Sequence, residues 1–307
     1  MKTKLLKNKH NQYLLNSSLE NIAEAVNTNN INYLHETWQS SLKRCLPFET
    51  PAKTVSGQLP LNPEAKDFPL IISSSCSSTL DLARYMCEKE VLDNWGSLIA
   101  FEQYAGRGQM GRKWYSSVGN LFATLILPEL PGKIARLVPL IAGVSLSELL
   151  ESEGLVAGIK WPNDLIVNQG KVAGILVENR EGHIWLGLGV NLVHAPEEDL
   201  MRMQGAFKAA SLKDFGVSVD ILAFWSDFVA AVYHKIQNLL KSEDIASLVK
   251  EIEKRLLFLG QSIKVSKPAN KTDSFYGTLL GLEPDGALKI QKGNEIVTLY
   301  SAEILPG

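Results

Sequence analysis

The chain has 307 residues, enough for two compact units, and its composition (45% hydrophobic, 21% charged) is that of an ordinary soluble enzyme. A formal net charge of −2 excludes a global electrostatic bias toward nucleic acid or anionic membrane. Three cysteines without a CxxC pair argue against a disulfide framework, and five histidines without metal-ligand spacing argue against a dedicated zinc site. The basic start lacks the apolar core of a secretory signal, and the longest strongly apolar stretch, Leu137 to Leu146, is too short to span a bilayer. These features predict a cytoplasmic protein without a membrane segment.

Residues 1–66 form an N-terminal extension to which the sequence assigns no role. Within it we expect an amphipathic helix at Leu19–Val26, followed by a proline-containing, irregular connector. The extension has no compact helix-turn-helix pattern and no basic recognition helix. This argues against DNA binding.

From Phe68 to about residue 258, the periodicity predicts strands and helices that alternate along the chain. The expected strands are 70–73, 98–101, 121–127, 158–161, 165–168, 171–178 and 183–193. The expected helices are 79–91, 134–150, 221–240 and 245–257. This order is typical of an α+β or α/β domain, in which helices pack against a mixed sheet.

After Gly260 the pattern changes to short strands separated by Gly, Pro, Asn and Asp. The expected strands are 263–266, 275–281, 287–291 and 296–300. They predict a small all-β barrel of about fifty residues. The predicted domains are therefore 67–258 and 259–307.

Residues 106–114, Gly-Arg-Gly-Gln-Met-Gly-Arg-Lys-Trp, form what we call the Arg-Gly loop, and they formally match the GxGxxG dinucleotide fingerprint. That fingerprint requires a helix to begin within the glycine run, whereas here a further glycine and then a strand follow. The context therefore excludes a dinucleotide site. What remains is a cationic loop whose backbone amides and guanidinium groups, from Arg107 and Arg112, can close on an anion. A solvated surface loop accounts for this segment alone equally well.

Two further segments are more often structural than functional when each is taken alone. Lys160-Trp161-Pro162-Asn163-Asp164 has ordinary turn chemistry, and a lysine such as Lys171 at the start of a strand is usually solvated. The glycines of Gly187-Leu188-Gly189-Val190-Asn191 would permit a ligand to approach the backbone closely.

These segments occur in one order: Ser78-Thr79 opening a helix, Gln103, the Arg-Gly loop, the Lys-Trp-Pro-Asn-Asp turn, Lys171 and the Gly-x-Gly-x-Asn segment. In this combination and spacing the chain resembles the biotin protein ligase family, within the biotin/lipoate ligase superfamily, strongly over about residues 70–195. Residues 277–281 and 286–288 look like the SH3-like barrel that ends members of this family.

The resemblance implies a mixed-sheet catalytic domain that forms biotinyl-5′-AMP from biotin and ATP with Mg²⁺. Biotin would then pass to a lysine of a biotin carboxyl carrier protein, or of the corresponding domain of a biotin-dependent carboxylase. The catalytic residues implied are Lys171, Arg107 and Arg112. Biotin would be bound by Ser78, Thr79, Leu80, Gln103, Arg107, Gly108, Gln109, Lys171 and Gly174. ATP would be bound by Arg112, Trp114, Lys160, Asn163, Asp164 and Asn191, with Asp164 close to Mg²⁺. A homodimer is left open.

Elementary chemistry agrees with this implication. A carboxylate that attacks an α-phosphate brings like charges together, so cations must neutralise both groups. No protein nucleophile is needed, which fits the absence of GxSxG and of a convincing Ser/His/Asp arrangement. Three glycines, and repulsion between Arg107 and Arg112, predict that residues 104–114 become ordered around biotinyl-5′-AMP.

The chain departs from the family pattern at two positions. Gln109 stands where the family often has Arg, which predicts weaker retention of the adenylate, and Leu80 stands where it often has Asn, which removes a polar group near biotin. A lipoate ligase is the first alternative, opposed by the Arg-Gly loop, the turn at Lys160 and the C-terminal barrel. The second is a biotin-responsive transcriptional regulator, which would need a DNA-reading unit within residues 1–66.

Overall fold

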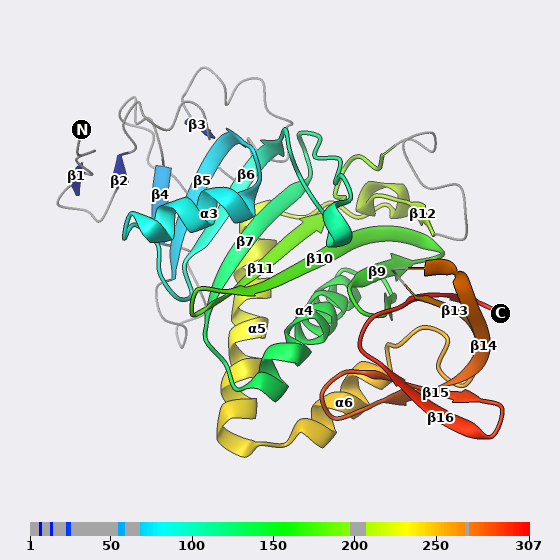
Figure 1. Cartoon of the computed structure of the whole chain (residues 1–307). Helices are drawn as coiled ribbons and strands as arrows, with labels where there is room; N and C mark the ends of the chain where they lie inside the picture. The colour runs from blue at the N-terminus through cyan, green and yellow to red at the C-terminus, as the bar shows by residue number, and fades with distance from the viewer. Residues whose placement is uncertain are drawn as a thin grey trace. The chain divides into compact units, whose positions relative to one another are not determined.

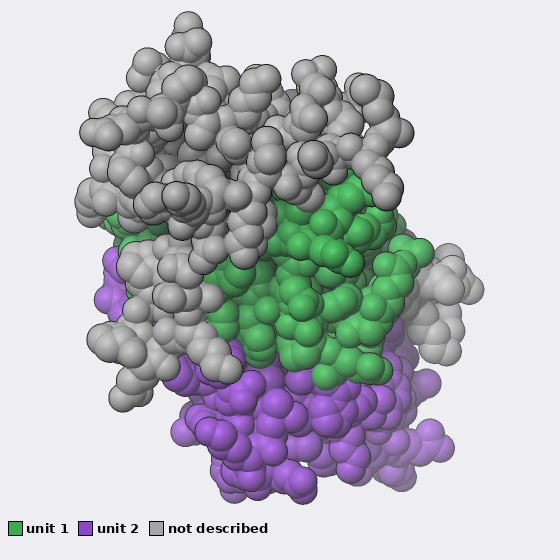
Figure 2. All heavy atoms as spheres, turned by 90° about the vertical axis from the view of Figure 1, so that its left-hand side faces the viewer, with its two compact units in different colours: residues 1–129, 172–196, 210–230 green, residues 130–171, 197–209, 231–307 purple. Residues whose placement is uncertain are grey.

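The computed structural model describes residues 68–196, 207–267 and 270–307, and four short strands nearer the N-terminus (Figure 1). These strands are β1 (Leu6–Lys7), β2 (Tyr13–Leu14), β3 (Ala23–Ala25) and β4 (Val55–Gln58). The chain divides into two compact units, coloured separately in Figure 2: residues 1–129, 172–196 and 210–230 in the first, and residues 130–171, 197–209 and 231–307 in the second. β10 (Gly170–Arg180) and helix α5 (Ile221–Ser242) each begin in one unit and end in the other.

The first unit is built on a mixed sheet in which β3, β5, β6, β7, β11 and β10 are neighbours in that order. The strands introduced here are β5 (Pro69–Cys76), β6 (Ser97–Gln103), β7 (Leu121–Pro128) and β11 (His183–Val190). β5 and β6 run parallel, while the other neighbouring pairs are antiparallel. Because parallel neighbours need a crossover, helix α3 (Thr79–Glu88) lies in the connection between β5 and β6. The expected mixed sheet with packed helices is confirmed.

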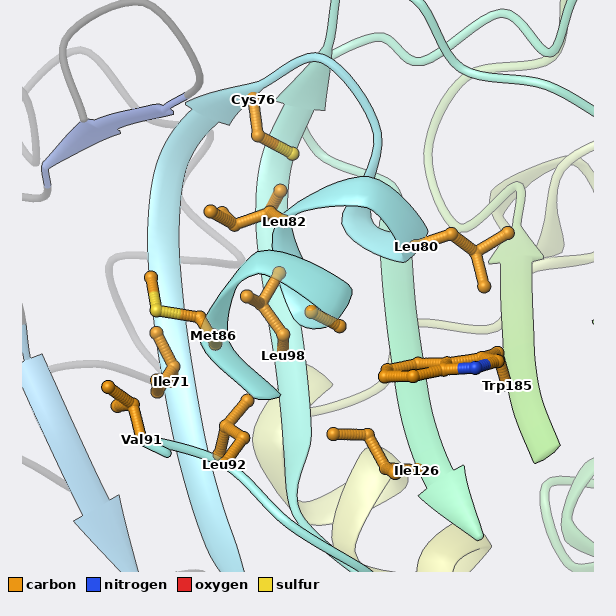
Figure 3. Packing of buried hydrophobic residues seen from close by; sticks show 12 residues of the cluster. Ile71, Cys76, Leu80, Leu82, Met86, Val91, Leu92, Leu98, Ile126 and Trp185 are labelled. Carbon is orange, nitrogen blue, oxygen red and sulfur yellow. The ribbon is translucent and has the colours of Figure 1, made fainter. Parts of the chain in front are cut away.

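Helix α3 packs against this sheet through its apolar face. Leu82 and Met86, one helical turn apart, are fully buried. Figure 3 shows them among apolar side chains from the strands and from the segment that follows the helix. The cluster consists of Ile71, Cys76, Leu80, Leu82, Ala83, Met86, Val91, Leu92, Leu98, Ala100, Ile126 and Trp185. Each large side chain buried here contributes about 1.5–3 kcal/mol, so the cluster holds both ends of α3 in place.

The second unit contains helices α4 (Gly132–Ser152) and α6 (Ile245–Glu253) and the hairpin of β8 (Ala157–Lys160) and β9 (Asp164–Val167). After α6 the chain pairs with β8: Ile159 N donates to Arg255 O (2.7 Å), and Leu257 N donates to Ile159 O (2.9 Å). This pairing ends the helix at Glu253 instead of at the predicted Leu257. The short strand β12 (Lys208–Ala209) runs parallel to the start of β10.

The C-terminal part of the second unit is a separate antiparallel sheet of five strands. They lie in the order β16, β15, β14, β13, β17. Their bounds are β13 (Ser262–Lys267), β14 (Asn270–Leu282), β15 (Leu288–Lys292), β16 (Glu295–Leu299) and β17 (Glu303–Pro306). The small all-β unit is thus confirmed, with β17, which the sequence analysis missed, beside β13.

The helix predicted at Leu19–Val26 is wrong where the structure describes this segment. Ala23–Ala25 forms β3, which pairs antiparallel with β5. Apart from the four short strands, residues 1–66 lie outside the described part of the chain, so the role of the extension stays open. Among the described residues, no helix is both long and apolar enough to cross a bilayer.

Candidate functional site

The first residues of α3 and the side chain of Gln103 belong to one hydrogen-bond network in the first unit. Ser78 is the N-cap residue of α3, and both Ser78 and Thr79 are buried. Gln103 Oε1 accepts from the Thr79 amide (2.8 Å), and Gln103 Nε2 donates to Ser116 Oγ (2.9 Å). Thr124 Oγ1 donates to Thr79 Oγ1 at 2.9 Å. The Gln103 side chain therefore connects the N-terminus of α3 to Ser116, just after the Arg-Gly loop.

The Arg-Gly loop is closed by its own backbone. Trp114 N donates to Gly106 O (2.8 Å), and Gly108 N donates to Arg112 O (2.7 Å). Its tip is a single 3-10 turn, Gln109–Gly111. A Cβ on Gly106 would lie 2.8 Å from Trp114 O, closer than real Cβ contacts, so the closure requires glycine at this position.

Arg107 is held by carboxylates. Its Nη1 and Nη2 donate to the two oxygens of Asp81, each at 2.7 Å, and its Nε lies 3.7 Å from Glu178 Oε1. Arg84 pairs with the same two carboxylates and lies over the Trp185 ring. The hydrogen bonds that Arg107 donates to Asp81 raise the pKa of Arg107. Desolvation lowers this pKa, and the charges of Asp81 and Glu178 raise it.

This network changes the expectation for the two loop arginines. Asp81 compensates the charge of Arg107, so repulsion from Arg112 is not its main interaction. Arg112 is exposed, and its Nη2 lies 3.6 Å from the sulfur of Met110, a weak acceptor. An anion bound at the loop would meet one arginine already paired with a carboxylate and one held weakly.

Trp114 lies against β11 at a glycine. A Cβ on Gly189 would be 2.6 Å from two atoms of the Trp114 indole, so the ring occupies the space that a side chain would need. Gly174 on β10 is the register partner of Gly189. The absence of a side chain at Gly189 thus leaves room for the Trp114 ring, while the approach of a ligand to the Gly-x-Gly-x-Asn segment stays a prediction.

Leu80 belongs to the apolar cluster of Figure 3, and only 3% of it is exposed. A Cβ on Gly187 would lie 3.2 Å from Leu80 Cδ1, so this leucine fills the space over the first glycine of β11. Leu80 is therefore a core residue that presents almost no surface.

Asn191 holds the end of β11 to the next segment of the first unit. It is buried, its amide N donates to Val172 O (2.8 Å) and its Nδ2 donates to Ala210 O (3.2 Å). Its carbonyl accepts from Leu212 N at 2.9 Å. These contacts give the asparagine a structural role beside the ligand role that the resemblance implies.

In the second unit, the Lys-Trp-Pro-Asn-Asp turn joins β8 to β9. Lys160, 9% exposed, ends β8, and its Nζ lies 5.8 Å from the ring centroid of Phe207. Trp161 is buried and donates from Nε1 to Gly286 O of the C-terminal sheet (2.9 Å). That sheet therefore supports the turn directly, a contact that the motif itself does not reveal.

Lys171 and Asp164 form an ion pair in the same unit. Lys171 Nζ lies 2.6 Å from Asp164 Oδ1, and about a quarter or less of each side chain is exposed (25% and 20%). Asn163 donates its amide to Lys160 O at 3.2 Å. The structure thus brings together Lys160, Asn163, Asp164 and Lys171, while the other predicted site residues lie in the first unit.

Several residues missed by the sequence analysis organise these two groups. Asp81 and Glu178 hold Arg107, and Ser116 fixes Gln103. Asn120 is buried, accepts from the amides of residues 193 and 194, and donates to the carbonyl of residue 194. In the sequence these are ordinary polar residues. Their roles depend on partners that lie far away along the chain, so no local pattern could have revealed them.

Comparisons with known proteins agree on one family. The model of the biotin/lipoate A/B protein ligase family matches residues 75–191, and that of the biotin protein ligase C-terminal domain matches residues 258–305. A biotin–[acetyl-CoA-carboxylase] ligase of Paracoccus denitrificans is 32% identical over 226 residues, covering 68% of this chain and 90% of the relative. The bifunctional ligase/repressor BirA of Bacillus subtilis is 27% identical over 252 residues, covering 76% of this chain and 71% of the relative.

Among solved structures, the biotin protein ligase of Aquifex aeolicus in complex with biotin and ATP has a similar fold. The TM-score is 0.67 at 24% sequence identity, and the match covers 78% of this chain and 99% of the other.

Proposed function

The chain belongs to the biotin protein ligase family, and we propose that it is an ATP-dependent ligase that forms biotinyl-5′-AMP and transfers biotin to a lysine of a biotin carboxyl carrier protein. The observation that carries this is the pairing of a ligase core with a biotin protein ligase C-terminal domain in one chain. The C-terminal match favours biotin over lipoate, because its family model is named for the biotin enzymes.

The first unit supplies the proposed biotin site. Gln103, Ser78 and Thr79 would form its polar side, and Leu80 packs beneath them in the core. The backbone of Gly108 and Gln109 and the strand residue Gly174 are assigned to its lining by the family resemblance. Polar groups that are already hydrogen-bonded to one another are suited to a neutral ureido ring, because each can exchange a protein partner for a ligand partner at little cost.

The proposed chemistry requires cations where a carboxylate meets an α-phosphate. Arg107, Arg112 and Lys171 are assigned to this role, because guanidinium and ammonium groups neutralise charge on both reacting groups. Arg107 and Lys171 each have a carboxylate partner without ligand, so both would exchange that partner for the substrate anion.

ATP is assigned to Arg112, Trp114, Lys160, Asn163, Asp164 and Asn191. Asp164 offers a carboxylate, and Mg²⁺ is commonly held by one or two carboxylates together with substrate phosphates, so the donor chemistry of the turn fits this ion. When bound, Mg²⁺ would neutralise phosphate charge. Trp114 presents an indole over a glycine-lined strand, which suits stacking against a planar base.

The acceptor is assigned by family likeness only. The relatives that combine ligase and repressor in one protein raise DNA binding as a second activity. The sequence of residues 1–66 offers no basic helix to neutralise phosphates, so we assign ligase activity without sequence-specific DNA binding. A cytoplasmic location remains a prediction, and a homodimer stays open.

Transfer of labelled biotin to a biotin carboxyl carrier domain tests the proposal. With ATP and Mg²⁺ the label should reach the wild-type acceptor, and it should not reach an acceptor whose target lysine is replaced by alanine. ATP–pyrophosphate exchange that depends on lipoate and not on biotin would instead identify a lipoate ligase. A mobility-shift assay with and without biotin, at physiological salt, tests the regulator alternative.

A further inference from the structure

Three side chains without a part in the proposed ligase chemistry meet at the C-terminal end of α3. Cys87 lies in the last turn of the helix, Asp93 in the turn that follows, and His183 at the first position of β11. Each offers one ligand atom, and the three atoms lie within 4.8 Å of one another. All belong to the first unit.

The distance between the thiol sulfur and the imidazole nitrogen suits a metal ion with tetrahedral coordination. Cys87 Sγ and His183 Nε2 are 3.8 Å apart. With Zn–S near 2.3 Å and Zn–N near 2.0–2.1 Å, a tetrahedral angle separates sulfur and nitrogen by about 3.6 Å. A shift of a few tenths of an ångström would therefore bring both atoms to bonding distance of one zinc ion.

The hydrogen bond on the other side of the imidazole sets the tautomer that a metal requires. His183 Nδ1 lies 2.9 Å from Asn94 Oδ1. An amide oxygen only accepts, so Nδ1 carries the proton and Nε2 directs its lone pair toward Cys87. A ligating histidine usually donates its second ring nitrogen to such a partner, which fixes the ring and raises its basicity.

The turn that carries Asp93 and Asn94 is held in place by its backbone. Gly96 N donates to Asp93 O (2.8 Å), and Trp95 N donates to Ile126 O of the sheet (2.6 Å). A Cβ on Gly96 would lie 2.8 Å from Asp93 O, so the turn requires glycine there. The His183 ring also contacts Trp185 edge-on, with centroids 5.5 Å apart. Donors on fixed elements lose little entropy when they bind an ion.

Charge also favours a divalent cation at this place. The carboxylates of Asp93, Glu88 and Glu181 lie near enough to the Cys87 thiol to act on it electrostatically. This is a negative field that a cation would relieve. A thiolate and one carboxylate together carry −2, so a zinc ion makes the set neutral, and binding releases the thiol proton.

A simpler reading is a thiol that donates weakly to a histidine at the edge of the core. That reading accounts for the 3.8 Å contact, but it leaves the approach of the Asp93 carboxylate and the orientation of His183 by Asn94 as coincidences. We infer that Cys87, Asp93 and His183 bind one Zn²⁺, with water as the fourth ligand. Cys87 and His183 are 96 positions apart, so no spacing rule applied to the sequence could have found this set.

Cobalt substitution tests the site in the full-length chain, purified without a histidine tag and without ATP. One equivalent of Co²⁺ should give thiolate-to-metal charge-transfer absorption, and Zn²⁺ should abolish it by competition while Mg²⁺ and Ca²⁺ should not. Cys87→Ser should remove the absorption. The matched thiol control, Cys45→Ser, should leave it unchanged.

Two further variants separate metal binding from folding. Asp93→Ala changes an exposed side chain and should weaken zinc binding without altering thermal unfolding in the absence of metal. Asn94→Ala keeps all three ligands but removes the orienting bond, so zinc affinity should fall about 10–100-fold, as for other such partners. Absence of the cobalt absorption, or equal zinc affinity in wild type, Cys87→Ser and Asp93→Ala, would overturn the inference.

Discussion

Replacing Lys171 by alanine should reduce the rate of adenylate formation far more than it reduces stability. The side chain makes one ion pair, at 2.6 Å, with the partly exposed Asp164. Partly solvated pairs of this kind contribute about 0–1 kcal/mol to folding, so the free energy of unfolding should change by no more than that. A preorganised group that stabilises charge developing in a transition state typically contributes about 10²–10³ in rate. We therefore expect biotin-dependent ATP–pyrophosphate exchange to fall by about 10²–10³ in Lys171→Ala.

Two matched variants show what the lysine supplies. Lys171→Arg keeps the charge but changes the donor geometry, so it should recover part of the lost rate. Asp164→Asn removes the partner while keeping the lysine, and it should impair ATP use without abolishing biotin binding. Chemical denaturation of each variant gives the unfolding free energy beside the exchange rate. Exchange in Lys171→Ala within about threefold of wild type, or a loss of stability of several kcal/mol, would refute the reasoning.

Three further changes test the first unit. Gln109→Arg should slow the release of biotinyl-5′-AMP, because charge-assisted hydrogen bonds are about twice as strong as neutral ones, and equal release rates would contradict this. Gly189→Val places a side chain where the Trp114 indole lies, so the unfolding free energy should fall by about 1–3 kcal/mol, and denaturation curves matching wild type would show that the ring can move freely. Asp81→Asn removes the carboxylate that holds Arg107, so calorimetry should show tighter binding of biotinyl-5′-AMP; weaker binding would mean that Asp81 positions the arginine for its ligand.

The sequence predicted most of the long elements of the fold, because their patterns are local. The apolar positions of α3 recur at helical spacing, and the buried strands of the sheet are continuous apolar runs bounded by polar turns. The elements that were not predicted are short strands that form because they pair with another strand. β3 and β17 have three and four residues, and pairing with β5 or β13, which no local pattern reveals, makes them strands.

The end of α6 failed for the same reason. Leu256 and Leu257 continue the helical pattern, but the backbone of Ile159 offers hydrogen bonds to residues 255 and 257, and the chain leaves the helix to make them. Gly158 leaves room for the Leu257 side chain at this point. A tertiary pairing thus overrides a helical periodicity that was otherwise interpreted correctly.

For the candidate site, the motifs identified residues but not their partners. Arg107 could be singled out because arginine in a glycine-bearing loop suggests an anion, whereas Asp81 is an ordinary acidic residue in the first turn of α3. The distance in sequence between partners is 26 positions here and 94 between Arg84 and Glu178. The Arg84–Glu178 pair, for example, forms only when the folded sheet places β10 close to α3.

Arg107 and Lys171 are each paired with a carboxylate, and these pairs limit how much free energy either cation can contribute to ligand binding. A partly buried cation without a counter-charge carries a desolvation cost, and Asp81 and Asp164 remove that cost for Arg107 and Lys171. A phosphate that binds to either cation replaces its carboxylate partner. Each exchange therefore contributes only the difference in free energy between the new ion pair and the old one. A cation that has no carboxylate partner contributes its full interaction with the ligand. Of the two loop arginines, Arg112, which is exposed and contacts a thioether, is nearer to that condition. With neutral Gln109 at the tip, the loop has no second arginine of this kind, so retention of the adenylate should depend on Arg112 more steeply than on Arg107.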